Sequence, residues 1–139
     1  MDSASESQHS SAENKIRFYL VDDDDLFHLI HNRFIKSQLP EAEIISFIDP
    51  REALTAIAET RDSPQPAILL LDLNMPYLSG WEWLDAFSKK WDFTNTSLKI
   101  FILSSSDSMQ DRIRVHEYAH ISGYLVKPLS KEAIASIVA

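Results

Sequence analysis

Short apolar segments alternate along the chain with longer segments in which apolar residues recur at the spacing of a helix. The apolar segments have the length of strands, and residues 67–71 (AILLL) are apolar throughout, as in a strand buried on both faces. The predicted strands are residues 16–21, 43–48, 67–71, 99–103 and 123–126. The predicted helices are residues 24–38, 49–60, a segment that begins at 79, 107–119 and 130–138.

Polar residues mark the starts of the predicted helices. Asp49, Pro50 and Glu52 supply an N-cap acid, a proline in the first turn and a glutamate at the third position. Ser79 and Glu82 have the spacing of a capping box. Two other helices are expected to be capped in a similar way, the first by Asp24 and Asp25 and the fourth by Asp107 with Gln110.

Large side chains indicate which helix faces pack inward. In the first helix Phe27, Ile30 and Phe34 share one face. The histidines form no metal-binding pattern, and His28 and His31 are interpreted as surface residues of this helix. The third helix carries large aromatic side chains that we interpret as fillers of the core and its grooves, namely Trp81, Trp83 and Trp91.

Five strand–helix units in succession predict a parallel sheet with helices on both faces. The crossover connections are expected to be right-handed. The fold class is therefore a doubly wound α/β domain. Periodicity alone does not choose a strand order, and it does not indicate a function.

Composition limits the classes of protein to which the chain can belong. The 139 residues suit one domain, predicted here as residues 15–139, after a serine-rich and acidic segment, 1–14, that we interpret as a disordered tail. No apolar run approaches the ~20 residues of a membrane span, and the start of the chain has no signal-peptide pattern. The formal net charge of −8 disfavours binding to nucleic acid. The absence of cysteine fits a cytoplasmic protein.

Polar residues stand immediately after four of the five predicted strands. Asp22 and Asp23 follow the first, Asp72 ends the third, Ser104 follows the fourth and Lys127 follows the fifth. In an open parallel sheet these strand ends share one edge, which is where ligands bind in this architecture. We therefore expect residues that are far apart in the sequence to meet in one crevice.

Such a crevice has the equipment for phosphoryl transfer. Three carboxylates at close quarters repel one another and need a cation, and oxygen ligands without histidine or cysteine favour Mg²⁺. A lysine and a hydroxyl group opposite the metal can stabilise a transferring phosphoryl group. A carboxylate can act as the nucleophile and form an acyl phosphate.

Four motifs in order resemble the receiver domain of bacterial two-component response regulators. They are Val21-Asp22-Asp23, Leu70-Leu71-Asp72-Leu73-Asn74-Met75-Pro76, Leu103-Ser104-Ser105-Ser106 and Gly123-Tyr124-Leu125-Val126-Lys127-Pro128. The resemblance covers nearly the whole chain from Lys15. It implies a flavodoxin-like five-stranded parallel sheet of order 2-1-3-4-5. Tyr77 and the pair His120-Ile121 depart from the usual family pattern, which leaves the shape of their loops open.

The resemblance also implies a role for each matching position. Asp72 would accept the phosphoryl group, and Lys127 would pair first with Asp72 and then with that group. Ser104 would donate to a phosphoryl oxygen, and Tyr124 would then rotate inward as a switch. Asp23 would bind Mg²⁺ directly, with Asp22 nearby or bound through water. Asp72 and the backbone carbonyl of Asn74 would complete the metal site. The Lys127–Pro128 bond would be cis.

By sequence alone, Ser105 or Ser106 could also take the role given to Ser104. Ser104 is favoured because it directly follows the fourth strand. Asn74 and Ser106 would tune the slow hydrolysis that such domains catalyse on their own acyl phosphate.

The implied function is phosphorelay signalling by a cytoplasmic switch that is not an enzyme in the ordinary sense. The phosphoryl donor would be a histidine kinase or a histidine phosphotransfer protein, and the output would be a surface formed by the fourth helix, the fifth strand and the fifth helix. The downstream protein target is open, and the chain would be a monomer or a weak dimer that depends on phosphorylation. Neither nucleic acid nor a membrane is an expected partner of this chain alone.

Two other classes of function stay open. One is a haloacid-dehalogenase-type phosphatase, although that class has an acid where this chain has Asn74 and usually places its nucleophile after the first strand. The other is a degenerate receiver that acts as an interaction module. The last helix ends early, at Ala139, so the chain is compatible with either a stand-alone regulator or a fragment of a larger protein.

Overall fold

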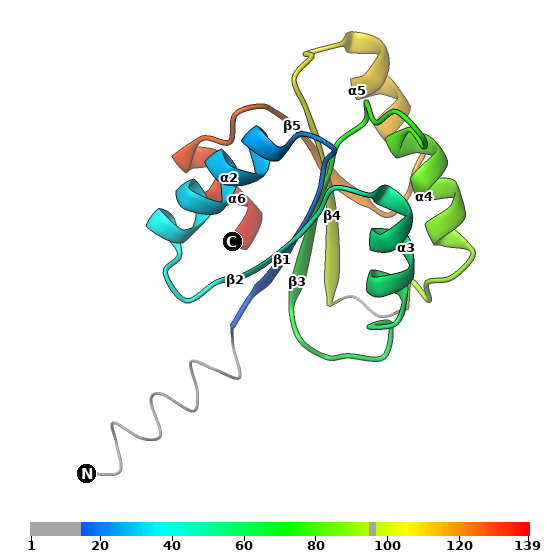
Figure 1. Ribbon diagram of the computed structural model, residues 1–139. Coiled ribbons are helices and arrows are strands. Elements are labelled where there is room, and N and C mark those ends of the chain that lie inside the picture. Colours follow the sequence, from blue (N-terminus) through cyan, green and yellow to red (C-terminus); the bar gives the residue numbers. More distant parts are fainter. Residues whose placement is uncertain (1–14, 95–96) are drawn as a thin grey trace.

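The computed structural model describes residues 15–94 and 97–139, which form alternating strands and helices (Figure 1). The strands are β1 (Arg17–Val21), β2 (Glu43–Phe47), β3 (Ala67–Leu71), β4 (Leu98–Ser104) and β5 (Ile121–Val126). The helices are α2 (Asp25–Gln38), α3 (Pro50–Ala58), α4 (Gly80–Ser88), α5 (Met109–Val115) and α6 (Lys131–Val138). The tail predicted for residues 1–14 lies outside the described residues.

The strands form one parallel sheet of order β2-β1-β3-β4-β5. This is the doubly wound, flavodoxin-like arrangement predicted from the sequence. In the register of the sheet Val21 pairs with both Phe47 and Leu71, so β1, β2 and β3 end at the same level. The residues that follow these strands therefore leave the sheet side by side.

Helices cover both faces of the sheet, with α2 and α6 on one face and α3, α4 and α5 on the other (Figure 1). Alternate residues of β1 point to opposite layers: Phe18 packs toward α2 and α6, and Tyr19 toward α3, α4 and α5. Each fully buried aliphatic side chain contributes ~1.5–3 kcal/mol by leaving water. None of the helices in the described part of the chain is long and apolar enough to cross a bilayer.

The core of the α3–α4 layer is built from stacked aromatic rings. Trp83 and Trp91 flank Phe87, with ring centroids 4.8 and 5.2 Å away. The indole N–H of Trp83 donates to the buried carbonyl oxygen of Pro50 at 2.8 Å, which fixes α4 against the start of α3. Trp81, Trp83 and Trp91 are all buried, as predicted.

Several helix starts agree with the sequence analysis. Asp24 caps α2 and Asp49 caps α3, and the predicted capping box between Ser79 and Glu82 is formed in both directions. In α5, the fourth of the predicted helices, the predicted cap was wrong. Its N-cap is Ser108, whose hydroxyl accepts from the Asp111 N–H.

Helix α5 is also shorter than predicted. It ends at Val115 and not at residue 119, because the next N–H groups donate three residues back, Glu117 to Arg114 and Tyr118 to Val115. Bonds of this type tighten the backbone into a turn and end the α-helix. The fifth strand in turn begins at Ile121, two residues earlier than predicted. A register shift between Ile100 and Phe101 of β4 lets this extra length pair.

The buried face of α2 differs from the predicted one. His28, His31 and Ile35 are buried, whereas Ile30 is 41% exposed. The interpretation of both histidines as surface residues was therefore wrong. The inward stripe is rotated by one residue, so that it begins at His28 and not at Phe27.

Candidate functional site

The register of the sheet brings two of the predicted acids together. Because Val21 pairs with Leu71, the residues that follow them, Asp22 and Asp72, leave adjacent strands at the same edge. The Asp72 N–H donates to the carbonyl oxygen of Val21 at 2.9 Å, and the Asp22 N–H donates to that of Phe47 at 3.1 Å. These bonds extend the ladder of the sheet and fix the main chain from which both carboxylates project.

A group of three acids stands at this edge. Asp22, Asp23 and Asp72 each offer a carboxylate oxygen, and these atoms lie within 4.8 Å of one another. Asp22 and Asp72 are buried and Asp23 is exposed, so the group has one side open to solvent. A set of oxygen donors with an open side suits Mg²⁺, which keeps part of its water shell. The fourth predicted ligand, the carbonyl of Asn74, belongs to an exposed residue just beyond β3.

Lys127 reaches this group from the end of β5. Its ammonium nitrogen lies 2.5 Å from an oxygen of Asp22 and 3.4 Å from an oxygen of Asp72. Its side chain is 5% exposed. The expected pairing with Asp72 is present, but the contact with Asp22 is shorter. The Lys127–Pro128 bond is cis, as the resemblance implies.

The charges at this edge do not balance, since one ammonium group faces three carboxyl groups. Burial and the neighbouring Asp22 carboxylate raise the pKa of Asp72 to about 6, against the opposing effects of Lys127 and of the Asn74 N–H. The carboxyl group of Asp72 is therefore mostly ionised at pH 7, at a cost that a bound cation would reduce. An ionised carboxylate has the lone pairs that a nucleophile needs.

Ser104 contacts the main chain of Lys127, and Tyr124 contacts the loop that follows Ser104. Ser104 is completely buried at the end of β4, and its carbonyl oxygen accepts from the Lys127 N–H at 2.7 Å. Its hydroxyl accepts from the Ser106 N–H at 3.2 Å. The Tyr124 hydroxyl donates to the carbonyl oxygen of Ser106 at 2.5 Å. Of the three consecutive serines, Ser104 is the buried one that contacts Lys127, whereas Ser105 and Ser106 are exposed.

Gly80, which the sequence analysis did not single out, sets how closely α4 approaches the site. A Cβ atom at this position would lie 2.7 Å from the carbonyl oxygen of Asp72 and 2.9 Å from the Cα of Leu73. Both neighbours are backbone atoms and cannot move aside easily. The Gly80 N–H also donates to the Leu73 carbonyl oxygen at 2.9 Å. Glycine therefore lets the first turn of α4 support the loop after Asp72.

The two buried histidines of α2 contact the site, although their sequence pattern was interpreted as a surface position. His28 donates from Nε2 to the carbonyl oxygen of Asp22 at 2.6 Å, and His31 accepts from the Leu129 N–H at 3.5 Å. Burial, aided by the charge of Lys127, lowers the pKa of His31 to about 4. A signal was available, because His28, His31 and Ile35 have the i, i+3, i+7 spacing of one helix face.

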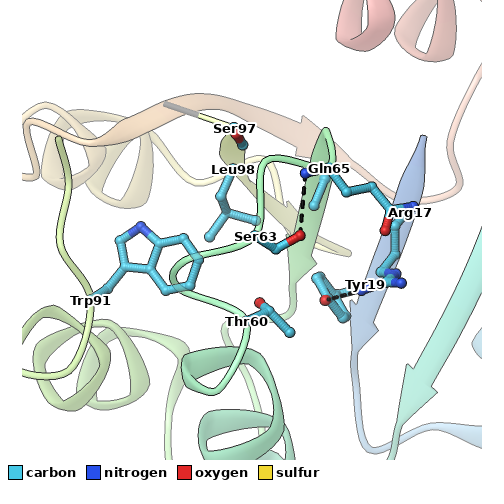
Figure 2. Close-up of a pocket in the computed structure, with 9 residues that line it drawn as sticks. Arg17, Tyr19, Thr60, Ser63, Gln65, Trp91, Ser97 and Leu98 are labelled. Atoms are coloured by element: carbon cyan, nitrogen blue, oxygen red, sulfur yellow. Dashed lines mark hydrogen bonds between the residues drawn. The ribbon is translucent and has the colours of Figure 1, made fainter. Parts of the chain in front are cut away.

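A pocket at the opposite end of the sheet offers no comparable site (Figure 2). It has a volume of about 10 Å³, enough for a water molecule only. It lies at the amino ends of β1, β3 and β4, and residues that line it include Arg17, Tyr19, Ser63, Gln65 and Trp91.

The sequence matches the family model of the response regulator receiver domain over residues 18–139. A transcriptional regulatory protein, DegU of Brevibacillus brevis, is 28% identical over 126 residues, which cover 91% of this chain and 50% of that protein. The chain thus spans about half of the length of this curated relative.

Solved structures share the fold. A two-component response regulator from Cytophaga hutchinsonii is 25% identical with a TM-score of 0.81, covering 90% of this chain and 95% of that one. A response regulator receiver protein from Dyadobacter fermentans has a TM-score of 0.80 at 18% identity, covering 88% and 94%. A Vibrio cholerae chemotaxis protein, CheY4, has a TM-score of 0.66 at 21% identity, covering 89% and 96%. With the family model matched over most of its length, this chain belongs to the response regulator receiver domains, a family of phosphoacceptor switches.

Proposed function

We propose that Asp72 accepts a phosphoryl group from a phosphohistidine and that the modified domain then presents an altered surface to a downstream protein. The observation that supports this most is the buried carboxyl group of Asp72, whose pKa is raised to about 6, beside two other acids and the ammonium group of Lys127. This arrangement combines a nucleophile, a place for a cation and a fixed positive charge.

The transfer exchanges one bond to phosphorus for another. A carboxylate oxygen of Asp72 attacks the phosphorus atom, the P–N bond to the donor imidazole breaks, and its electron pair returns to the ring nitrogen. Lys127, held 3.4 Å from Asp72, compensates negative charge on the phosphoryl oxygens. The hydroxyl of Ser104 donates to one of these oxygens once its loop rearranges.

The acid group fits the Mg²⁺ that receiver domains typically bind. Asp22, Asp23 and Asp72 would hold the ion together with the carbonyl oxygen of Asn74. The bound ion supplies charge neutralisation and orientation of the phosphoryl group.

The switch acts on the surface formed by α5, β5 and α6. In this structure the Tyr124 hydroxyl bonds to the carbonyl oxygen of Ser106 in the loop between β4 and α5. Phosphorylation adds about −1.5 to −2 charge and draws the Ser104 hydroxyl toward Asp72. That movement displaces Ser106, releases Tyr124 to rotate inward and biases α5 between two packings. Asn74 and Ser106, both exposed, tune the slow hydrolysis of the acyl phosphate.

The proposed partners follow from the chemistry. The donor is a histidine kinase or a histidine phosphotransfer protein, and the output partner is a protein. We further propose that the domain acts in the cytoplasm, as a monomer or as a weak dimer that forms on phosphorylation.

Intact-mass measurement tests the proposed reaction. With Mg²⁺ and acetyl phosphate as donor, the protein is expected to gain one adduct of ~80 Da, the mass of a phosphoryl group, on its nucleophile. Asp72→Asn should abolish the adduct, Glu43→Gln at the far end of the sheet should leave it intact, and chelation of Mg²⁺ should slow its formation strongly. An adduct that survives Asp72→Asn would refute the assignment.

The same samples separate the other two classes of function. Steady release of product from a phosphomonoester would indicate a phosphatase of the haloacid-dehalogenase type. Failure to bind Mg²⁺ and to take up phosphate would indicate an interaction module. The proposal requires a single turnover onto Asp72 followed by slow loss of the adduct.

A further inference from the structure

Three side chains of α2 contact residues or main chain of the candidate site. Phe27, His28 and His31 lie at positions i, i+1 and i+4 of the helix, and we call them the α2 clamp. His28 and His31 are buried and Phe27 is partly buried. The mechanism proposed above gives none of them a chemical role, although each contacts a segment that carries a residue of the site.

His28 holds the main chain of Asp22. Its Nε2 atom lies 2.6 Å from the carbonyl oxygen of Asp22 and 3.2 Å from that of Phe47. Both neighbours can only accept, so the hydrogen atom must reside on Nε2. The imidazole therefore joins the ends of β1 and β2 at the level where the acid leaves the sheet.

His31 holds the segment that follows Lys127. Its Nε2 atom accepts from the Leu129 N–H at 3.5 Å, so this nitrogen must be unprotonated and the neutral ring must carry its hydrogen on Nδ1. The two histidines thus require opposite tautomers. Leu129 is itself buried and stands two residues after Lys127, which limits how the lysine main chain can shift.

Phe27 contacts both His31 and Lys127. Its ring stacks on the imidazole of His31, with centroids 5.7 Å apart and planes inclined by 24°. The ammonium nitrogen of Lys127 lies 4.2 Å from the centroid of the Phe27 ring. A cation at this distance from an aromatic face is attracted to it, more strongly when both are shielded from water.

We propose that the α2 clamp positions the Asp22 carboxylate and the Lys127 ammonium group relative to Asp72, and thereby sets the rate at which Asp72 is phosphorylated. His28 fixes the acid, His31 fixes the strand end that carries the lysine, and Phe27 fixes the lysine head group. This inference rests on the proposed function, because the rate concerned is that of phosphoryl transfer to Asp72. The three residues are positioning residues, since none contacts the reacting atoms.

The first test compares initial rates of phosphorylation by acetyl phosphate at saturating Mg²⁺ in the full chain. Removing partners that orient a site residue typically costs 10–100-fold, so His28→Leu and His31→Leu are each expected to slow the reaction by at least about tenfold. The conservative variants His28→Gln and His31→Gln place an amide nitrogen or oxygen near the position of Nε2 and should restore most of the rate. Ile57→Val, in the core on the other face of the sheet, is the control for a simple loss of packing.

The second test needs neither Mg²⁺ nor phosphate. Nitrogen-15 NMR of the imidazoles should show His28 with its hydrogen on Nε2 and His31 with its hydrogen on Nδ1. Loss of one hydrogen bond worth ~1 kcal/mol changes the equilibrium constant for local opening by about fivefold. The hydrogen of the Leu129 amide should therefore exchange with solvent about fivefold faster in His31→Leu than in Ile57→Val. His31→Gln should restore slow exchange, and it also serves if the leucine variant does not fold.

The outcomes separate the two proposals. Slow leucine variants with recovery in the glutamine variants, together with the opposite tautomers, support the α2 clamp. Leucine variants as fast as Ile57→Val, or glutamine variants as slow as leucine, would overturn it even if Asp72 is phosphorylated. If the wild-type protein takes no phosphoryl group on Asp72, the proposed function fails, and the role of the clamp in phosphoryl transfer fails with it. The tautomers and amide exchange then decide whether its hydrogen bonds exist.

Discussion

The two ends of the sheet each hold a basic side chain beside one or more acids, and they differ in how the charges balance. At the amino ends of the strands Arg17 Nε lies 3.0 Å from Glu43 Oε1, and the same guanidinium donates to the Tyr19 hydroxyl at 3.1 Å. These side chains of arginine and glutamate are 22% and 35% exposed. The hydrogen bond from Arg17 lowers the pKa of Glu43, so the pair favours its own charged form.

At the carboxyl ends of the strands the positive and negative charges are not matched. Lys127 faces Asp22 and Asp72, with all three side chains less than a tenth exposed, and Asp23 stands close by. Burial and Asp22 raise the pKa of Asp72 here, although a cation lies beside it. A partly exposed pair with matched charges contributes a little stability and needs no further ion. A buried group with excess negative charge is costly until it gains a cation or loses a charge, which is the property expected of a site that binds and reacts.

Removal of Lys127 is the test of this contrast with the largest expected effect. Without its ammonium group, buried acids are left without a counter-charge, and loss of one partner of a buried pair typically costs about 3–5 kcal/mol. We therefore expect Lys127→Met to lower the free energy of unfolding by about that amount in urea at pH 7 without metal. Arg17→Met is the matched change at the other end and should cost far less. Equal losses would show that the two ends do not differ as argued.

Neutralising Asp72 should have the opposite sign. Because the folded protein raises the pKa of this carboxyl from 3.8 to about 6, its ionisation opposes folding at neutral pH. Asp72→Asn removes that charge and is expected to raise the free energy of unfolding at pH 7 by about 3 kcal/mol without Mg²⁺. The gain should shrink when Mg²⁺ is added, because the ion stabilises the wild-type protein more. A less stable Asp72→Asn variant in metal-free buffer would contradict this.

The pH dependence of the free energy of unfolding separates the contributions of Asp72 and His31. A raised carboxyl pKa contributes stability below about pH 4 that is lost as the pH rises toward 6. His31 acts in the opposite direction: its pKa is lowered from 6.5 to about 4, so its contribution is present above pH 6.5 and is lost as the pH falls. The two effects oppose each other in the wild-type protein between pH 4 and 6.

Asp72→Asn removes the first effect and exposes the second. In this background the free energy of unfolding is expected to fall by about 1–2 kcal/mol between pH 7 and pH 5, and the double variant Asp72→Asn/His31→Gln should lose less. Urea titrations of both variants at the two pH values measure the difference. Parallel curves would mean that His31 does not titrate as its burial implies.

The strand pattern and the residues at the strand ends were enough to predict most of the fold and the residues of the site. Apolar runs followed by Asp22, Asp72, Ser104 and Lys127 are local signals, and parallel topology converts them into neighbours without further information. The identity of the buried acids and of the lysine could therefore be predicted. Their distances could not, since the shorter contact of Lys127 with Asp22 depends on the register of the sheet and on packing from α2.

Features that depend on tertiary context escaped prediction. His28 and His31 have polar rings, and contacts with the Asp22 and Phe47 carbonyls and with the Leu129 N–H offset the cost of burying them. The role of Gly80 depends on how closely α4 approaches Asp72, which no local pattern records. The end of α5 at Val115 is decided by turn hydrogen bonds that compete with the helix.

The smallest expected effect is at the amino ends of the strands. Glu43 is more than a third exposed, so its bond with Arg17 is screened by water, and Glu43→Gln should cost only about 0.5 kcal/mol at pH 7, less at high salt. This variant should bind Mg²⁺ and take up phosphate from acetyl phosphate as the wild type does. Urea unfolding at low and high salt, with calorimetric Mg²⁺ titration, measures both. A weakened Mg²⁺ affinity would mean that the two ends are coupled through β1, since Arg17 begins the strand that Asp22 follows, and the contrast between a self-contained pair and an unbalanced site would no longer hold.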